Sequence, residues 1–468
     1  MKKFLALLLA MVMTLALVAC GGNDQKDPAP STPDPAPSTT PADDNKTPEP
    51  EPAPAEPTGA SEITLWTYPI GDWGTEATVK TLTDAFTAET GIAVKVEYLA
   101  YADGDDKVNT AITAKSTPDL IMEGPERLVA NWGANGKMVD LKDMFDDTDL
   151  AEINAVNEGV MKSCTHTNGA IYEYPLVMTA HCMAVNVNAF KEAGADKYLH
   201  LDTHTWTTQE FIDAVAALYA HYNDTVGAVF CAGQGGDQGT RALVNNMYGG
   251  TFTNAEHTAY TWDDPLNVKA LEQLKSMDGI EFDASLAGGD EIAKFYQGAL
   301  KMAFCWNIAQ QLSPNGKGEE TGAEKTVTGD DIAFMSFPSE DGNSKLQGGI
   351  WGFGIFDNGD QARIDAAKEF IKFFCDSAHT VDAVKAARYF AVRSTAEGTD
   401  LSAIWADEPI MAEYTKLMPF LGDYYQITTG WAGARTAWWN MLQAVGTGDD
   451  VAAAVAAGVA EANAAAAG

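Results

Sequence analysis

Residues 62–98 read EITLWTYPIGDWGTEATVKTLTDAFTAETGIAVKVEY, and this stretch indicates the fold class of the chain. The apolar run at residues 62–67 is typical of a buried β-strand. Residues 75–90 carry the apolar spacing of an amphipathic helix, and Gly91 marks the end of that helix. A second strand is predicted at residues 92–98. Because a helix joins the two strands, we predict a βαβ unit and hence a parallel sheet covered by helices.

The same alternation of strand and helix patterns continues along the chain. Further strands are predicted at residues 118–122, 182–187, 301–305, 332–337 and 350–356, and further helices at residues 107–115, 208–222, 268–277, 291–299, 361–375 and 451–466. Roughly 400 residues of this α/β pattern exceed one hydrophobic core and predict two lobes. Open parallel sheets bind ligands beyond the carboxyl ends of their strands. The aromatic side chains that follow the first strand therefore occupy the expected place of a ligand.

The N-terminus has the pattern of an export signal. Two lysines precede an apolar run that is too short to span a membrane, and the run ends in Leu17-Val18-Ala19-Cys20. This ending resembles the lipobox of bacterial lipoproteins, which implies a signal peptide at residues 1–19 and lipidation of the Cys20 thiol. An ordinary signal peptide is the alternative. Residues 20–60 are rich in proline and acidic side chains and predict an extended tether.

Composition restricts the partners and the chemistry. A net charge of −36 makes nucleic acid and bare anionic lipid poor partners. The five cysteines after Cys20 are far apart and lack a CxxC pattern, so we expect buried free thiols. His200 and His204 are four residues apart, but a chance pair is a better explanation than a zinc site. No GxSxG, HExxH or P-loop motif occurs, so we predict neither an enzyme nor a cofactor.

Seven short blocks, in order along the chain, resemble the bacterial extracellular solute-binding proteins of sugar ABC importers, the family that includes maltose-binding protein. The blocks lie at residues 62–66 with 89–96, 116–121, 136–141, 172–176 with 185–186, 205–207, 297–303 and 366–371. The resemblance implies the two-lobed periplasmic-binding-protein-like fold of type II, with parallel-type sheets, helices on both faces of each sheet and three hinge crossings. It also implies a monomer that captures a carbohydrate, an oligosaccharide by preference, between closing lobes and delivers it to a membrane permease.

The same likeness gives the domain bounds and the location. It implies that lobe one comprises residues 61–178 plus 336–390 and that lobe two comprises residues 180–335 plus 392–468. The crossings are expected near residues 176–180, 335–338 and 389–394. The protein is expected outside the cytoplasm, anchored to the outer face of the membrane by the lipidated cysteine.

A sugar offers apolar C–H faces to aromatic rings and a hydroxyl rim to planar polar groups, so a sugar site needs both kinds of side chain. Several such residues fall where the family places its ligand contacts. The candidates are Trp66, Tyr68, Asp72 and Trp73 after the first strand, Glu123 and Glu126 after the strand at 118–122, Met178, Thr179 and His181 at the first crossing, Trp306 and Asn307, Trp351, and Trp431 with Arg435.

Two alternatives stay open at this point. A binding protein for another solute, such as a polyamine, iron or a peptide, is the first. The second is a secreted carbohydrate-active enzyme, because Glu123 and Glu126 resemble a glycosidase pair. Stacked rings with few acids in the cleft indicate a sugar, whereas three or more acids indicate a cation. Met178 and Thr179 stand where the family has an acidic residue, so maltodextrin is not favoured and the sugar stays open.

Overall fold

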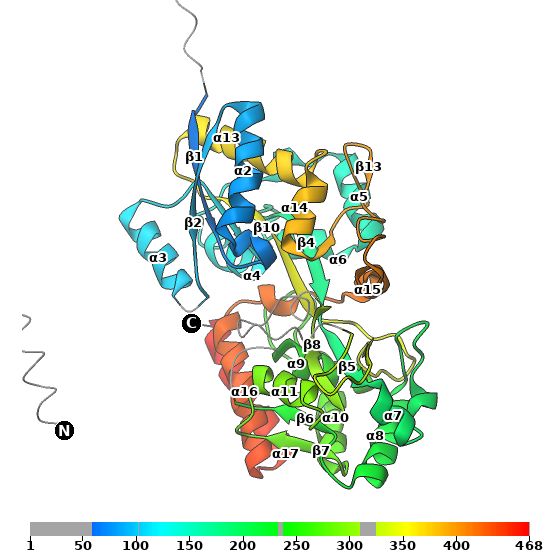
Figure 1. Ribbon diagram of the computed structural model, residues 1–468. Helices are drawn as coiled ribbons and strands as arrows, with labels where there is room; N and C mark the ends of the chain where they lie inside the picture. The colour runs from blue at the N-terminus through cyan, green and yellow to red at the C-terminus, as the bar shows by residue number, and fades with distance from the viewer. Residues whose placement is uncertain (1–58, 102, 233–236, 309–323, 468) are drawn as a thin grey trace, which may run out of the picture. The chain divides into compact units, whose positions relative to one another are not determined.

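The computed structural model describes residues 59–467 apart from residues 102, 233–236 and 309–323 (Figure 1). The predicted signal peptide, Cys20 and the tether up to residue 58 lie outside the described residues. Within the described part of the chain, no helix combines the length and the apolar character needed to cross a membrane. The five cysteines after Cys20 are all buried and free, as the sequence predicts.

Lobe one is the part of the chain built on a six-stranded sheet with the order β11-β4-β10-β3-β1-β2. Its strands are β1 (Glu62–Thr67), β2 (Ala93–Tyr98), β3 (Leu120–Glu123), β4 (Tyr174–Ala180), β10 (Gly348–Ile355) and β11 (Phe390–Ala391). β1 pairs in parallel with both β2 and β3, so that Leu65 lies opposite Val96 and Leu120. The βαβ unit predicted at residues 62–98 is therefore confirmed.

Helices cover both faces of this sheet. They are η1 (Gly71–Gly74), α2 (Glu76–Thr90), α3 (Gly104–Ala114), α4 (Pro125–Arg127), η2 (Leu128–Gly133), η3 (Lys142–Met144), α5 (Asp147–Val156), α6 (Gly159–Cys164), α13 (Gln361–Cys375) and α14 (Thr380–Ala387). Aromatic rings hold α2 and α13 together, since Phe86 packs edge-on against Phe370 at 5.1 Å between ring centroids. Gly71 has a φ of +54°, and a Cβ there would lie 2.0 Å from the carbonyl oxygen of Ala387, so the close approach of α14 requires glycine.

Lobe two is the part built on a three-stranded sheet, β8-β5-β9, and a two-stranded sheet, β6-β7. Its elements are β5 (Cys182–Asn186), α7 (Val187–Glu192), η4 (Asp196–Tyr198), α8 (Thr208–Tyr222), β6 (Gly227–Phe230), α9 (Asp237–Tyr248), α10 (Pro265–Ser276), β7 (Ile280–Asp283), α11 (Gly288–Tyr296), β8 (Met302–Trp306), β9 (Ile332–Met335), η6 (Tyr425–Ile427), α16 (Trp431–Thr447) and α17 (Val451–Ala467). A capping box starts α8: the Thr207 N–H donates to Glu210 Oε2 at 2.7 Å, and the Glu210 N–H donates back to Thr207 Oγ1 at 3.2 Å.

The expectation of parallel-type sheets holds only in part. β10 runs antiparallel to β3 and β4, β11 runs antiparallel to β4, and β5 runs antiparallel to β8 and β9. Among the described strands, the parallel pairs are β1–β2, β1–β3 and β6–β7. The reason is the route of the chain: β10 and β11 join the first sheet after the chain has passed through lobe two. No βαβ crossover therefore imposes the parallel direction on them.

The chain passes between lobe one and lobe two at three places. At the first passage, β4 ends at Ala180 and β5 begins at Cys182. At the second, β9 is followed by β10. At the third, β11 is followed by a segment that contains β12 (Thr395–Ala396), β13 (Thr399–Asp400), α15 (Pro409–Tyr414) and η5 (Thr415–Phe420). The first two passages touch, because the His181 N–H donates to the carbonyl oxygen of Gln347 at 2.7 Å. That these passages act as a hinge, with the domain bounds given above, stays a prediction.

Candidate functional site

A cavity of ≈ 670 Å³ is lined by residues of both lobes. From lobe one come Tyr101, Asp103, Asp105, Asp106, Glu126, Arg127, Ala130 and Asn131, and from the C-terminal part of the chain come Thr428, Gly430, Trp431, Ala432, Gly433, Arg435 and Ala465. Two aromatic rings, two guanidinium groups and four carboxylates therefore surround one space. This combination suits a polar ligand that also carries an apolar face.

The sheet explains why the lobe-one residues meet. β2 and β3 lie on either side of β1 and run in the same direction, so their carboxyl ends share one edge of the sheet. The segment after β2 leads into α3 and supplies Tyr101 and the aspartates, while the segment after β3 leads into α4 and supplies Glu126 and Arg127. On the other side, Trp431 and Arg435 come from the first turns of α16.

Arg127 is the centre of the lobe-one side. Its Nε lies 2.7 Å from Asp105 Oδ1, and its Nη1 lies 3.1 Å from Glu123 Oε1 and 3.7 Å from Glu126 Oε1. The side chain is 20% exposed, so part of the guanidinium faces the cavity while three carboxylates fix its orientation. A guanidinium held in this way is a preorganised donor for ligand oxygens.

Two tyrosines form a stacked pair beside Arg127. The rings of Tyr68 and Tyr101 are 5.1 Å apart at 26°, and the guanidinium carbon of Arg127 lies 5.1 Å and 5.6 Å from their centroids. Tyr68 is fully buried and its hydroxyl donates to Asp105 Oδ1 at 2.5 Å, whereas Tyr101 is 49% exposed. The buried ring supports the exposed one, and Tyr101 is the ring that a ligand can reach from lobe one.

Three glutamates lie at and behind the lobe-one wall. Glu126 lines the cavity and accepts a hydrogen bond from the hydroxyl of Tyr424 at 2.8 Å. Glu123 is 1% exposed, and burial raises its pKa to about 8 despite the neighbouring Arg127. Glu173 is completely buried, and burial, with Glu126 and Glu123 nearby, raises its pKa well above the usual range.

Trp431 forms the opposing wall on a buried support. The guanidinium carbon of Arg241 lies 4.9 Å from the centroid of the Trp431 ring, and Arg241 Nε donates to the Tyr425 hydroxyl at 3.0 Å. Tyr425 in turn stacks on Phe252 at 4.5 Å. The indole is half-buried, so these contacts hold it while part of its surface borders the cavity.

Of the residues predicted from the sequence, the structure brings Glu126, Trp431 and Arg435 together around the cavity. Tyr68 and Glu123 lie one layer behind it, in contact with Arg127. All five stay predictions as ligand contacts, and their common location is what the structure adds.

The other aromatics of the opening stretch have different surroundings. Trp73 is completely buried, with its ring 5.4 Å from Phe353 and 5.6 Å from Phe374 in the core of lobe one. Asp72 points to Arg388, whose Nε lies 3.5 Å from its Oδ2. Trp73 therefore belongs to the core of lobe one and Asp72 to an exposed ion pair, and neither lines the cavity.

Three further predicted tryptophans are not among the described residues that line the cavity. Trp66 is half-buried under the ammonium of Lys107 at 5.4 Å, and Trp351 stacks on Tyr389 at 4.6 Å and 8°. Trp306 is completely buried in lobe two.

The remaining predicted residues lie at the first chain passage. Met178, Thr179 and His181 are buried, and Asn307 Nδ2 donates to Thr179 Oγ1 at 3.1 Å. This bond joins the end of β8 in lobe two to β4 in lobe one. None of these four residues lines the cavity in the described part of the chain.

Sequence reasoning missed several residues of the site. They are Tyr101, Asp103, Asp105, Asp106, Arg127, Asn131, Glu173 and Tyr424. A usable signal existed for the first four, because they follow the end of a predicted parallel strand, which is the rule that selected Glu123 and Glu126. Glu173 stands in the block at residues 172–176, but nothing in that block assigns it to the site, and no sequence pattern marks Tyr424; both reach the site through the tertiary fold.

A second cavity of ≈ 630 Å³ lies between the end of α9, the loop at residues 249–255 and the loop at residues 339–347. None of the predicted residues is among its described lining residues. Of its three aromatic lining residues, Phe252 and Tyr425 are each 3% exposed and Tyr248 is half-buried. Unlike the first cavity, its described lining does not place one reachable aromatic ring from each lobe on opposite sides. We therefore do not assign the proposed ligand to this second cavity.

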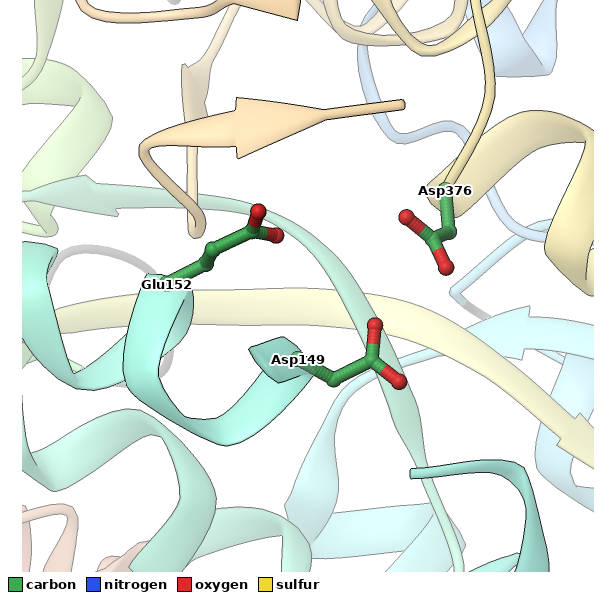
Figure 2. A group of neighbouring side chains, drawn as sticks. All are labelled: Asp149, Glu152 and Asp376. Atoms are coloured by element: carbon green, nitrogen blue, oxygen red, sulfur yellow. The ribbon is translucent and has the colours of Figure 1, made fainter. Parts of the chain in front are cut away.

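The carboxylates of Asp149, Glu152 and Asp376 also come close to one another (Figure 2). Arg393 Nη2 lies 2.9 Å from Asp149 and also bonds Glu152, and Arg393 Nη1 lies 2.8 Å from Asp376. Lys372 lies 3.2 Å from Asp149 and 2.9 Å from Asp376. These two basic side chains already satisfy the three acids, so the cluster is an ion-pair network and not a metal centre.

Comparisons with known proteins agree with this architecture. The family of bacterial extracellular solute-binding proteins matches residues 72–378. No curated protein matches the chain at the sequence level. Among solved structures, the cyclic alpha-maltosyl-1,6-maltose binding protein from Arthrobacter globiformis is 19% identical with a TM-score of 0.67, over 87% of this chain and 99% of that one.

Two other solved structures are similar to the same extent. The GacH receptor of Streptomyces glaucescens, studied with acarbose, is 16% identical with a TM-score of 0.64, over 85% of this chain and 96% of that one. Lmo0181 from Listeria monocytogenes, an ABC substrate-binding protein in complex with cycloalternan, is 15% identical with a TM-score of 0.62, over 86% of this chain and 98% of that one. At these identities the likeness concerns the fold. Because the family match spans well over half of the sequence, this chain belongs to the bacterial extracellular solute-binding proteins.

Proposed function

We propose that this protein captures a carbohydrate in the cavity between its lobes and delivers it to the permease of an ABC importer. The observation that carries the proposal is the pairing of two reachable rings, Tyr101 and Trp431, with two guanidinium groups, Arg127 and Arg435, around one space. The rings suit the C–H faces of a sugar, and the guanidinium and carboxylate groups suit its hydroxyls. The solved relatives named for maltosyl, acarbose and cycloalternan ligands support an oligosaccharide.

We propose that the protein binds its ligand without catalysing a reaction. Glu123, one member of the candidate glycosidase pair, is buried and its carboxylate is bonded to Arg127 and to the Gly124 N–H. These contacts turn Glu123 away from a role in attacking or protonating a glycosidic bond, which supports binding without catalysis. Family membership supports the same conclusion, since the family is named for solute binding.

A cationic solute is a second candidate, and a specific observation favours it. Four carboxylates, from Asp103, Asp105, Asp106 and Glu126, line the cavity against two guanidinium groups. This count exceeds the three acids that we associate with a cation. Arg127 pairs with two of them, Asp105 and Glu126, but its single positive charge cannot neutralise both, so the four carboxylates still outnumber the two guanidinium groups.

A thermal-shift panel separates the two candidates. We expect a neutral saccharide at 100 times its Kd to stabilise the protein by ~2.7 kcal/mol, which raises Tm by a few degrees. The panel comprises mono-, di- and oligosaccharides, including maltotriose and cycloalternan, with spermidine and putrescine as the cationic arm. A shift with a polyamine and with no saccharide would support the second candidate and contradict the first.

We also propose that the protein acts on the outer face of the membrane, held there by lipid on Cys20. Family membership implies a location outside the cytoplasm, and the lipobox and the proline-rich segment support the anchor. A chain of some 40 extended residues at about 3.1 Å each would allow the lobes to reach a permease on the order of 100 Å away.

Replacing Cys20 by alanine is expected to move the protein from the membrane fraction to the soluble, exported fraction. Acyl chains bind a bilayer with roughly 0.8 kcal/mol per buried CH₂, and the variant has no site for them. Cell fractionation and immunoblotting measure the change. Cys164→Ala is the matched control, because this buried thiol is not part of the lipobox sequence and its loss should leave the membrane fraction unchanged. Membrane association of the Cys20→Ala variant would contradict the anchor.

A further inference from the structure

Glu123, Glu126 and Glu173, which we call the glutamate cluster, form an unusual group behind the ligand cavity. Glu173 is 0% exposed, and neither of its carboxyl oxygens has a hydrogen-bond partner in the described part of the chain. A buried carboxylate without a donor or a cation is costly, and the ordinary response is to keep a proton.

The charges around the glutamate cluster do not balance. Among the described residues, Arg127 is the one basic side chain within 4 Å of its carboxylates, and Arg127 is shared with Asp105. The titratable and charged groups that face the cluster from the packed elements are Asp105 of α3, Arg127 of α4, Cys164 of α6, Cys375 of α13, and Tyr68, Tyr101, Tyr389 and Tyr424. Arg435 lines the cavity with Glu126, but Glu123 and Glu173 lie behind the cavity wall, where Arg127 is the one cation named above, so ionising both would leave uncompensated negative charge in a buried space.

The cluster reaches the ligand cavity through two side chains. Glu126 lines the cavity and bonds Tyr424, and Arg127 lines it and bonds Glu123. Ionising the buried members would draw Arg127 inward and repel Glu126, which changes the wall that a ligand meets. A neutral ligand over this wall also excludes water from it, and this strengthens the repulsion among the ionised carboxylates.

We propose that the glutamate cluster holds a proton at neutral pH and that loss of this proton weakens capture of the neutral saccharide proposed above. The inference thus adds a pH-dependent control to the proposed function and rests on it. The direction of the pH dependence follows from linkage. The saccharide-bound protein holds the proton more tightly than the ligand-free protein, so the bound state is favoured at lower pH. A cationic ligand would act in the opposite way, because it displaces the proton and binds more tightly as the pH rises.

The sign and the window follow from the buried carboxyl groups. Burial raises the pKa of Glu123 to about 8 in the arrangement described here, whereas an exposed glutamate titrates near its usual value of about 4.3. Saccharide affinity is therefore level below about pH 7 and falls as the pH rises through 8. With one linked proton and a pKa of about 8 in the ligand-free protein, we expect the affinity at pH 9 to be up to about tenfold below that at pH 6.

Calorimetric titration with the neutral saccharide that raises Tm most in the panel tests the coupling. Runs at pH 6, 7.5 and 9, each in two buffers of different ionisation enthalpy, give the affinity and the number of protons taken up on binding. We expect proton uptake at pH 7.5 for the wild type, less for Glu173→Gln, and none for the double variant Glu123→Gln/Glu173→Gln. Glu158→Gln, which alters an exposed glutamate, is the matched control and should behave as the wild type.

A ligand-free measurement keeps the two proposals separable. Infrared difference spectra between the wild type and Glu173→Gln at pH 7 should contain the carbonyl band of a protonated carboxyl group. Absence of this band overturns the proton site. Its presence with pH-independent saccharide affinity overturns the coupling. If no saccharide binds at pH 6 while the band is present, the proposed function fails and the proton site stands, and polyamine affinity that rises with pH then supports the cationic candidate.

Discussion

Replacing Arg393 by methionine is expected to lower the free energy of unfolding by about 3–5 kcal/mol, which is the usual cost of removing one partner of a buried ion pair. Arg393 is 4% exposed and contacts the carboxylates of Asp149, Glu152 and Asp376 at once. Methionine has a similar length but no charge, so three acids would face Lys372 alone. Urea unfolding of the ligand-free protein, with the midpoint and slope measured separately, gives the change.

The matched control is Arg388→Met. Arg388 and its partner Asp72 are each 44% exposed and 3.5 Å apart, and an exposed pair of this kind contributes about 0–1 kcal/mol. Equal losses in the two variants would contradict the role of the buried network.

The Arg393→Met effect should also shrink in acid. Burial opposes ionisation of Asp149, but the Asp146 N–H, Lys372 and Arg393 outweigh it and hold the pKa of Asp149 below its usual value. A lowered pKa contributes stability above the unfolded-state value of about 3.9 and loses it as the pH falls further. The two unfolding curves should therefore approach each other below about pH 4.

Replacing Trp431 by alanine is expected to weaken saccharide binding about tenfold to a few hundredfold, or ~1.4–3.5 kcal/mol. The loss combines the ring–sugar contact, worth about 0.5–1.5 kcal/mol beyond burial, with the apolar area itself. Titration of the variant with the saccharide selected by the panel measures the effect.

Trp439→Ala is the control for Trp431→Ala. Trp439 lies on the same helix and is also half-buried, but it does not line the cavity. Its replacement should leave affinity within about threefold of the wild type, which corresponds to less than 1 kcal/mol. Normal affinity in Trp431→Ala together with lower stability would make Trp431 a packing residue and remove it from the site.

Local sequence patterns were sufficient for most of the helices and strands. The helix predicted at residues 361–375 is α13, and the helix at 208–222 is α8, because spacing and capping residues fix such segments without help from distant parts of the chain. The Ala- and Val-rich end is the helix α17, with Val455, Val459 and Ala462 buried. The direction of β10 could not be predicted, since it depends on how the chain returns from lobe two.

The site was harder to predict than the fold, and tryptophan shows why. Trp73 and Trp431 look equally suited to ligand contact in the sequence. Trp73 is buried because Phe353 and Phe374, about 280 and 300 residues further along the chain, pack against it. Trp431 borders the cavity because Arg241 supports it from lobe two. Whether an aromatic ring packs or binds is decided by such remote partners, which no local pattern records.

The buried thiols make the protein a convenient starting point for a fluorescent reporter. Burial raises the pKa of Cys182 and of Cys231 to about 12, so neither forms the reactive thiolate at neutral pH, and the other three thiols after Cys20 are equally enclosed. A cysteine introduced at an exposed position would then be the one thiol that a maleimide dye modifies in the Cys20→Ala protein. Asn131 is exposed and lines the cavity, so a dye on Asn131→Cys would sit at the mouth of the site and change its emission when a ligand enters.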